Sequence, residues 1–141
     1  VGLVVGVLST GNELLESPLG GGDGVSPPPS QIYDANRPVL LSLLRALFPR
    51  TVAPVDLGIV PDDAGSLKDA LTSALERCDL VLTSGGISMG TRDHVPAVLA
   101  SLGCATVFKQ IYMKPGKPTG LFVQKRKDGS RGLVLCLPGN P

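Results

Sequence analysis

The chain has 141 residues, of which 43% are hydrophobic and 18% are charged, and its formal net charge is +1. This length and composition are typical of a single folded domain whose core needs no disulfide or metal to hold it together. The small net charge excludes a strong overall field for nucleic acid or membrane surfaces, so a bound anion would need a local site.

The first third of the chain predicts a strand, a surface insertion and a helix. Residues 3–8 form an apolar run that ends at residues 9–11, Ser-Thr-Gly, as is typical of a buried strand leading into a turn. Residues 17–30 consist largely of glycine, proline and serine, which predicts a flexible insertion. From Asn36 onward apolar residues recur at helical spacing, and we expect this helix to stop near Pro49.

Two further strand–helix units follow in the middle of the chain. Residues 52–57 predict a strand, and Asp62 and Asp63 then stand where a helix N-terminus favours acidic side chains. Residues 80–83 predict another buried strand, and a further helix is expected to begin around Asp93.

The last third of the chain predicts a β-hairpin. Residues 105–111 are a candidate strand, and residues 121–125 and 132–137 flank a turn at residues 128–129, Asp-Gly. Strand–helix units followed by a hairpin indicate an α/β fold, a three-layer sandwich in which helices cover both faces of a mostly parallel sheet. In such sheets ligands bind where strand carboxyl ends meet helix N-termini.

The three cysteines, Cys78, Cys104 and Cys136, lie far apart and predict isolated buried thiols in a reducing, cytoplasmic setting. With one histidine, they offer too few ligands for a structural zinc site. No apolar run approaches the roughly 20 residues that span a bilayer. Because the chain starts at Val1 and stops at Pro141, we expect residues 1–141 to be one domain of a longer multidomain protein.

Four glycine- or proline-rich loops follow predicted strands, at residues 9–14, 83–90, 113–118 and 137–141. In the second loop, adjacent glycines let the backbone approach a ligand and point several N–H groups at one anion. This loop also leads toward a helix N-terminus, which favours phosphate. Neither a P-loop nor a dinucleotide-binding glycine pattern is present, so the loop predicts a phosphate site of another kind.

The third loop holds two lysines, Lys114 and Lys117, each followed by a proline. The prolines stiffen the backbone and so reduce the entropy lost when two ammonium groups are placed together. Two like charges held close are unfavourable unless an anion neutralises them. The loop therefore predicts a site for a doubly charged oxyanion such as phosphate or molybdate, with an ordinary exposed basic loop as the alternative.

Six motifs together carry a family resemblance. They are STGNEL, the Asp34-Ala35-Asn36 triplet, DLGIVPDD, TSGGISMG followed by Asp93, MKPGKP and LPGNP. In this combination the chain resembles the central, molybdopterin-binding domain of the MoeA/gephyrin E-domain family over nearly its whole length outside residues 17–30. SGG loops also occur in the related G-type adenylyltransferases, whereas TGNEL, KPGKP and LPGNP favour the E type.

The resemblance implies a MogA-like fold and a molybdenum insertase. Such an enzyme inserts molybdenum from molybdate into adenylated molybdopterin, and it releases AMP and molybdenum cofactor with the help of a divalent cation, magnesium or zinc. The resemblance also implies a homodimer in the full-length protein and a G-type adenylyltransferase domain as a partner. The alternatives are a G-type adenylyltransferase and a gephyrin-like scaffold module that binds receptor tails.

The resemblance assigns catalytic roles to Asp93, Glu13, Lys114 and Lys117, and it makes Asp93 the metal ligand. The substrate-binding residues that it implies are Thr10, Gly11, Asn12, Asp34, Asn36, Ser84, Gly85, Gly86, Ser88, Gly90, Pro115, Gly116, Pro138, Gly139 and Asn140.

Simpler alternatives exist for several of these residues. Asp93 is also a natural helix cap, Glu13 a solvated acid, and Asp34 and Asn36 natural caps of the helix that follows them. The family usually has serine where Ala35 stands, so any hydroxyl contact there is lost.

Overall fold

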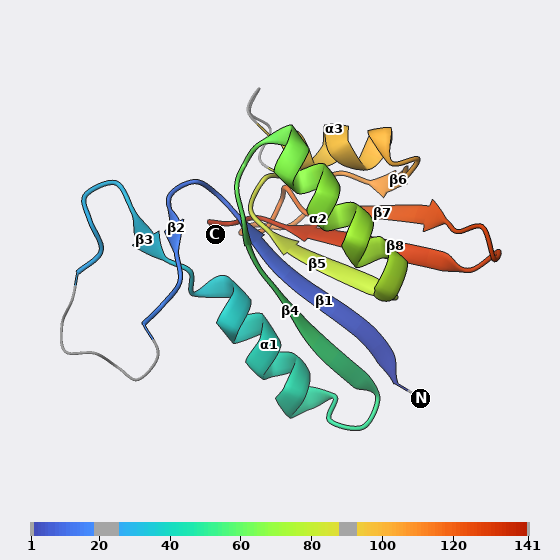
Figure 1. Cartoon of the computed structure of the whole chain (residues 1–141), viewed down its shortest axis with the longest axis horizontal. Coiled ribbons are helices and arrows are strands. Elements are labelled where there is room, and N and C mark those ends of the chain that lie inside the picture. The colour runs from blue at the N-terminus through green and yellow to red at the C-terminus, as the bar shows by residue number, and fades with distance from the viewer. Residues whose placement is uncertain (1, 19–25, 88–92, 141) are drawn as a thin grey trace.

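The structure is a computed structural model that describes residues 2–18, 26–87 and 93–140. Within these ranges six strands form one sheet, in the order β4-β1-β5-β8-β7-β6 (Figure 1). The strands are β1 (Leu3–Thr10), β4 (Val52–Val60), β5 (Leu80–Ser84), β6 (Ala105–Phe108), β7 (Gly120–Lys125) and β8 (Arg131–Leu137). The helices are α1 (Asn36–Leu47), α2 (Ala64–Arg77) and α3 (His94–Ser101).

Strand direction divides the sheet into a parallel part and a hairpin. β1 pairs in parallel with β4 and with β5, and β5 pairs in parallel with β8. β7 runs antiparallel to both β8 and β6. The predicted mostly parallel sheet with a C-terminal hairpin is therefore confirmed, and the carboxyl ends of β4, β1, β5 and β8 lie at one edge of the sheet.

Helices cover both faces of the sheet, as predicted for a three-layer sandwich. α2 and α3 pack on one face and α1 on the other (Figure 1). The larger core cluster joins α2 and α3 to the sheet through aliphatic side chains and one aromatic ring, Phe122. A smaller cluster beneath α1 contains Val5, Val7, Leu41 and Leu82. Burying each such side chain contributes about 1.5–3 kcal/mol.

The predicted strands and helices are confirmed with small changes of boundary. β1 and β4 extend past the apolar runs that predicted them, whereas β6 ends at Phe108 and does not reach residue 111. A two-stranded sheet of β2 (Leu14–Leu15) and β3 (Ile32–Tyr33) was not predicted, because two-residue strands have no periodicity to detect. Residues 19–25 of the predicted flexible insertion at 17–30 lie outside the described residues.

A buried arginine ties the start of α1 to the rest of the fold. Arg37 donates to Asp34 at 3.0 Å, and it also pairs with Asp56 of β4 and with Glu16. Asp34 in turn accepts a hydrogen bond of 3.0 Å from the hydroxyl of Ser9. Burial by itself lowers the pKa of Arg37, because it disfavours the charged form. The bonds to Asp56 and Asp34 outweigh this effect and raise the pKa above the ordinary value. The network fixes where α1 begins.

The three cysteines are buried free thiols, as predicted. Cys136 lies in β8 and is fully inaccessible to solvent. Burial raises the pKa of its thiol to about 11, which keeps the group protonated and unreactive at neutral pH.

Candidate functional site

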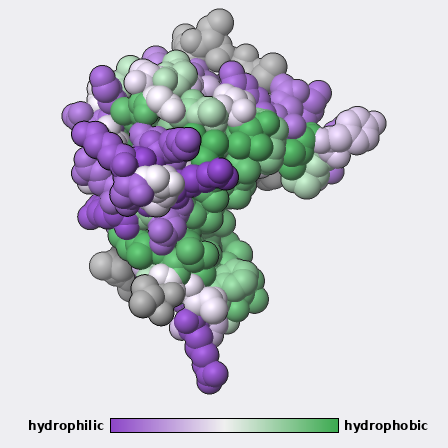
Figure 2. Space-filling view, turned by 90° about the vertical axis from the view of Figure 1, so that its right-hand side faces the viewer, coloured by the Kyte–Doolittle hydropathy of each residue, from purple (hydrophilic) through white to green (hydrophobic). Residues whose placement is uncertain are grey.

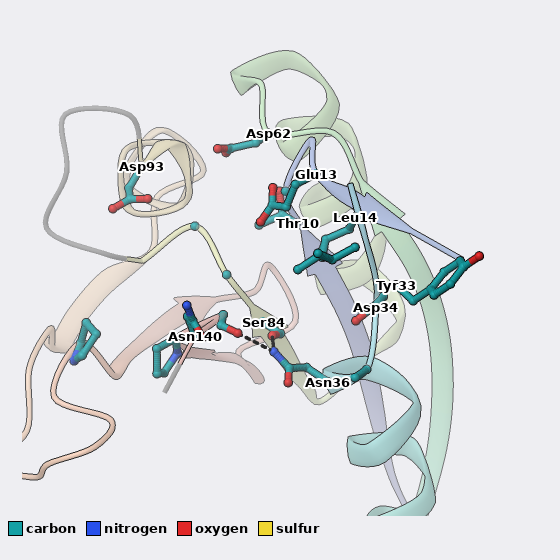
Figure 3. A pocket seen from close by; sticks show the side chains of 18 residues that line it. Thr10, Glu13, Leu14, Tyr33, Asp34, Asn36, Asp62, Ser84, Asp93 and Asn140 are labelled. Atoms are coloured by element: carbon teal, nitrogen blue, oxygen red, sulfur yellow. Dashed lines mark hydrogen bonds between the residues drawn. The ribbon is translucent and has the colours of Figure 1, made fainter. Parts of the chain in front are cut away.

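A cavity of about 440 Å³ opens at the carboxyl ends of the parallel strands (Figure 3). This is the edge where open α/β sheets bind ligands, because the loops diverge there and helices begin there. The lining residues come from the strand-end loops and from the starts of α1 and α3: Thr10, Gly11, Glu13, Leu14, Ile32, Tyr33, Asp34, Ala35, Asn36, Asp62, Ser84, Gly85, Gly86, Asp93, Pro118, Pro138, Gly139 and Asn140.

Three of the loops around the cavity pack against one another through glycine. Gly85 has φ +90°. A Cβ atom on Gly85 would lie 2.4 Å from the carbonyl oxygen of Thr10, and one on Gly139 would lie 3.1 Å from the Cα of Gly85. The N–H of Gly85 donates to the Leu137 carbonyl at 3.0 Å. The sequence predicted that these glycines let the backbone approach a ligand; the structure shows a close approach of the β5 loop to β1 and to the loop after β8.

Asn36, the first residue of α1, joins two of these loops. Its side-chain amide donates to the Ser84 hydroxyl oxygen and to the Gly139 carbonyl, both at 2.8 Å (Figure 3). Asp34 lies deeper, with both carboxylate oxygens bonded to Arg37 and with Ser9 donating to one of them. Asp34 also accepts from the backbone N–H of Arg37 in the first turn of α1, although the N-cap position itself is occupied by Ala35.

Three carboxylates, Glu13, Asp62 and Asp93, line one side of the cavity (Figure 3). Asp93 stands at the N-cap position of α3, but its side chain makes no capping hydrogen bond. Burial raises the pKa of Asp62 above its usual range, and the charges of Asp93 and Glu13 raise it further, whereas His94 lowers it. Asp62 therefore lies within electrostatic range of both other carboxylates.

Asp62 is a site residue that the sequence reasoning missed. Asp62 and Asp63 were both assigned to the N-terminus of the following helix, but only Asp63 caps α2, accepting from the Ser66 N–H at 2.8 Å. The side chain of Asn12 accepts from the backbone N–H of Asp62 at 3.0 Å and so connects the β1 loop to the β4 loop. Two adjacent acids look alike in a sequence, and the turn geometry decides which of them faces the cavity.

The lysine loop lies beside a second, smaller cavity and not in the wall of the first. Lys114 and Lys117 are exposed and line a hollow of about 300 Å³ together with Ile111, Tyr112 and Met113. The loop reaches the main cavity only through Pro118. The sequence reasoning grouped these lysines with the other site residues, but the structure gives them a separate surface.

The residues implied by the resemblance therefore fall into three groups. Those that line the main cavity are Thr10, Gly11, Glu13, Asp34, Asn36, Ser84, Gly85, Gly86, Asp93, Pro138, Gly139 and Asn140. Those that the structure describes but that do not line the main cavity are Asn12, Lys114, Pro115, Gly116 and Lys117. Ser88 and Gly90 lie outside the described residues.

The carboxylates suit a hard divalent cation, but they do not form a site in which protein ligands alone surround the cation. Among the residues that the structure describes, no group of three or more His, Cys, Asp or Glu side chains is placed to hold a metal ion. Magnesium is commonly bound by one or two carboxylates together with substrate phosphates and water. One or two of the carboxylates Glu13, Asp62 and Asp93 could therefore bind such a cation only together with ligand phosphates and water.

Comparison with known proteins agrees with this geometry. Residues 6–141 match a family model described as a probable molybdopterin binding domain. The chain is 43% identical to a molybdopterin molybdenumtransferase of Haemophilus influenzae, over 99% of this chain and 31% of that protein. It is 31% identical to gephyrin of Dictyostelium discoideum, over 97% of this chain and 21% of that protein.

A solved structure shares the architecture. A molybdopterin biosynthesis MoeA protein of Pyrococcus horikoshii superposes with a TM-score of 0.75 at 32% identity, over 99% of this chain and 31% of that chain. The present chain thus spans about a third or less of the relatives to which it is similar.

We predict that Gly85 is required for the packing of the loops. Gly85→Ala should destabilise the chain by about 1–3 kcal/mol more than Gly58→Ala, because the new Cβ atom would clash with the Thr10 carbonyl. Gly58 is a matched control, because it has φ +77° and nothing lies within 4 Å of an added Cβ. Its variant should lose only about 1–2 kcal/mol of stability, which is the cost of backbone strain alone. Urea unfolding measures both; equal losses would contradict the proposed clash.

We also predict that Asp62→Asn stabilises the folded chain at neutral pH. The pKa of Asp62 is raised on folding, so its ionisation costs stability. This cost is absent below the unfolded-state pKa, which is about 3.8, and is complete above the folded-state pKa. The advantage of the variant should therefore vanish as the pH falls to about 4.

Urea unfolding across this pH range tests the prediction, with Asp63→Ala as the control. Because the Ser66 N–H lowers the pKa of Asp63, loss of this cap should destabilise the chain at pH 7. An Asp62→Asn variant that is less stable than the wild type at pH 7 would show that Asp62 is a structural group.

Proposed function

Because this chain belongs to the molybdopterin-binding domain family, we propose that its main cavity binds adenylated molybdopterin and that it forms part of a molybdenum insertase. In this reaction molybdenum from molybdate enters the dithiolene of molybdopterin, and AMP and molybdenum cofactor are released. The observation that supports the proposal best is that one cavity gathers the TGNEL, SGG and LPGNP loops, which lie far apart in the sequence.

The polar walls of the cavity suit a pyrophosphate and its attached groups. Gly86 in the β5 loop lies against Val95 of α3, near the start of that helix, whereas the N–H of Gly85 is already bonded to the Leu137 carbonyl. The Ser84 hydroxyl and the Asn36 amide are held by their mutual hydrogen bond, so little entropy is lost in orienting them for a ligand. The loops after β1, β5 and β8 thus present a preorganised polar surface.

The carboxylates of the cavity would organise cleavage of the adenylate. A phosphoanhydride carries negative charge, which Glu13, Asp62 and Asp93 repel unless a cation lies between them. A bound divalent cation would supply charge neutralisation at the phosphates. We assign Asp93 to holding that cation beside the phosphates. Cleavage forms one bond from a water oxygen to phosphorus and breaks the bond between AMP and the molybdopterin phosphate, and Glu13 accepts the proton that water loses.

The lysine loop would bind molybdate at the second cavity. Lys114 and Lys117 are exposed and both line that cavity, and Pro118 connects the loop to the main cavity. An oxyanion held by the two ammonium groups would therefore lie apart from the three carboxylates, which would otherwise repel it.

The proposal also includes a cytoplasmic location, a homodimer in the full-length protein and a G-type adenylyltransferase domain as a partner. The three buried free thiols are consistent with a reducing compartment. Within the described ranges, no helix has the length and the apolar character needed to cross a membrane.

Asp93→Asn in the full-length protein tests the proposed chemistry. The variant keeps the shape of the side chain and removes its charge, so adenylated molybdopterin should still bind while AMP release falls about a hundredfold or more. Asp128→Asn is the control, because Asp128 lies in the β7–β8 turn and contacts only its own loop. AMP release at the wild-type rate in the Asp93 variant would limit Asp93 to a structural role.

Lys114→Ala and Lys117→Ala test the molybdate site separately. Each variant loses a charge-assisted contact worth about 1.5–3 kcal/mol, so cofactor formation should need about tenfold more molybdate or more. Binding of the adenylated pterin should change little, since the main cavity does not include these lysines. Lys127→Ala, in the exposed hairpin turn, is the control. Molybdate titrations that overlap with the wild type would remove the lysine loop from the site.

A further inference from the structure

The two-stranded sheet of β2 and β3 stands apart from the main fold as a short arm. It lies beside the start of α1, away from the six-stranded sheet (Figure 1). Among the described residues, neither core cluster includes a residue of β2 or β3, and these strands pack mainly against each other. Hydrophobic residues gather around a hollow on the side shown in Figure 2, which is the side of the molecule away from the arm. Hydrophobic burial therefore does not fix the position of the arm.

The pairing of the arm's own strands is weak. β2 and β3 run parallel, and each has two residues. Backbone bonds of 2.8 Å connect them, from the Ile32 N–H to the Glu13 carbonyl and from the Asp34 N–H to the Leu15 carbonyl. A single pair of strands is marginally stable in water, and parallel pairing is slightly less stable than antiparallel pairing. The arm therefore needs a further contact to stay closed.

An ion pair supplies this contact at the end of β2. The carboxylate of Glu16, the residue after Leu15, accepts from the guanidinium of Arg37 in α1. The pair thus ties β2 to the helix that follows β3, directly beside the backbone bond between Asp34 and Leu15. Separation of β2 from β3 at this end would pull Glu16 away from Arg37.

Among the carboxylates that bond to Arg37, Glu16 can leave most easily. Its side chain is 65% exposed, whereas that of Asp34 is 2% exposed. Asp56 is also held by the backbone N–H of Gly58, which donates to it at 2.9 Å. If Glu16 leaves, water solvates its carboxylate, and Arg37 keeps two carboxylate partners. The pair can therefore open and close without leaving a buried charge unpaired.

The arm forms one wall of the main cavity, which its residues Leu14, Ile32 and Tyr33 line (Figure 3). We propose that the ion pair between Glu16 and Arg37 is a latch that holds the β2–β3 arm closed against this cavity, and that its opening lets a ligand enter and leave. The latch follows from the contacts of the arm and does not depend on the proposed reaction.

Hydrogen exchange in the full-length protein tests the latch. The N–H groups of Ile32 and Asp34 must break their bonds between β2 and β3 to exchange, so they report opening of the arm. In Glu16→Gln they should exchange about threefold faster or more than in the wild type, because the charge of the pair is lost. Glu76→Gln, which removes an exposed charge from the end of α2, is the matched control and should leave both rates unchanged. The amides of β5 should keep their rates in both variants, which shows that the fold is intact.

The response to salt distinguishes a charged latch from a merely structural contact. Raising the salt concentration about tenfold should speed the exchange of Ile32 and Asp34 in the wild type, because salt screens exposed charges, and should leave Glu16→Gln unchanged. Equal exchange in the wild type and in Glu16→Gln would overturn the latch. A salt response that persists in the variant would overturn it as well.

AMP with magnesium is the probe for the role of the arm at the cavity. Its dissociation from Glu16→Gln should be about threefold faster or more than from the wild type, because the wall opens more often. Unchanged dissociation together with faster exchange would show that the arm does not retain a ligand and would overturn this role. If the wild type binds no AMP, the proposed function is contradicted, while the exchange of Ile32 and Asp34 still decides whether the latch exists.

Discussion

The close packing of the strand-end loops is the constraint on which the site depends. Gly85 lies so near the carbonyl of Thr10 that a side chain there has no space, and Gly139 lies against Gly85 in turn. Asn36 adds two hydrogen bonds of 2.8 Å that join α1 to the loops after β5 and β8. A cavity at the edge of a parallel sheet would otherwise be bordered by loops that move independently. Here its walls are coupled through the backbone, so a ligand meets groups that are already in place.

The charged side chains that border the two cavities have opposite signs. Glu13, Asp62 and Asp93 border the larger cavity, and Lys114 and Lys117 border the smaller one. In the proposed function, this separation would let the acidic groups share a cation with a phosphorylated ligand while the lysines attract an anion. If both sets faced one cavity, they would pair with each other and lose affinity for ligands. The buried pair of Asp34 and Arg37 shows that outcome, since both carboxylate oxygens of Asp34 are used within the fold.

Helix α1 connects the site and the core. Its first residue, Asn36, contributes to the cavity, and Arg37 anchors the helix to β4 through Asp56. Leu41 packs into the core beneath the helix, whereas Leu43 and Leu47 are exposed. The packing of α1 on the sheet therefore also positions Asn36 in the cavity.

The sequence by itself determined the architecture and most of the cavity. Apolar runs and helical spacing predicted the main strands and helices, because burial imposes a period that local sequence records. Glycine-rich loops at strand ends predicted the edge of the sheet at which the cavity lies, since parallel strands bring their carboxyl ends together. The family resemblance added Asp93 and Glu13, and both side chains line the cavity.

Only the tertiary structure decided how side chains with similar sequence signals are used. Asp62 and Asp63 are adjacent acids, yet one faces the cavity and the other caps α2, because the turn after β4 sends them in different directions. Asp34 and Asn36 belong to one motif, but they have different partners. Asp34 accepts a hydrogen bond from Arg37, whereas Asn36 donates one to the Gly139 carbonyl. Gly139 is far from Asn36 in the sequence, and the groups that hold Arg37 and Asp34 in place, Asp56 and Ser9, also come from other segments. Local sequence records the propensities of each segment, whereas the partner of a polar group is set by which distant segments the fold brings together.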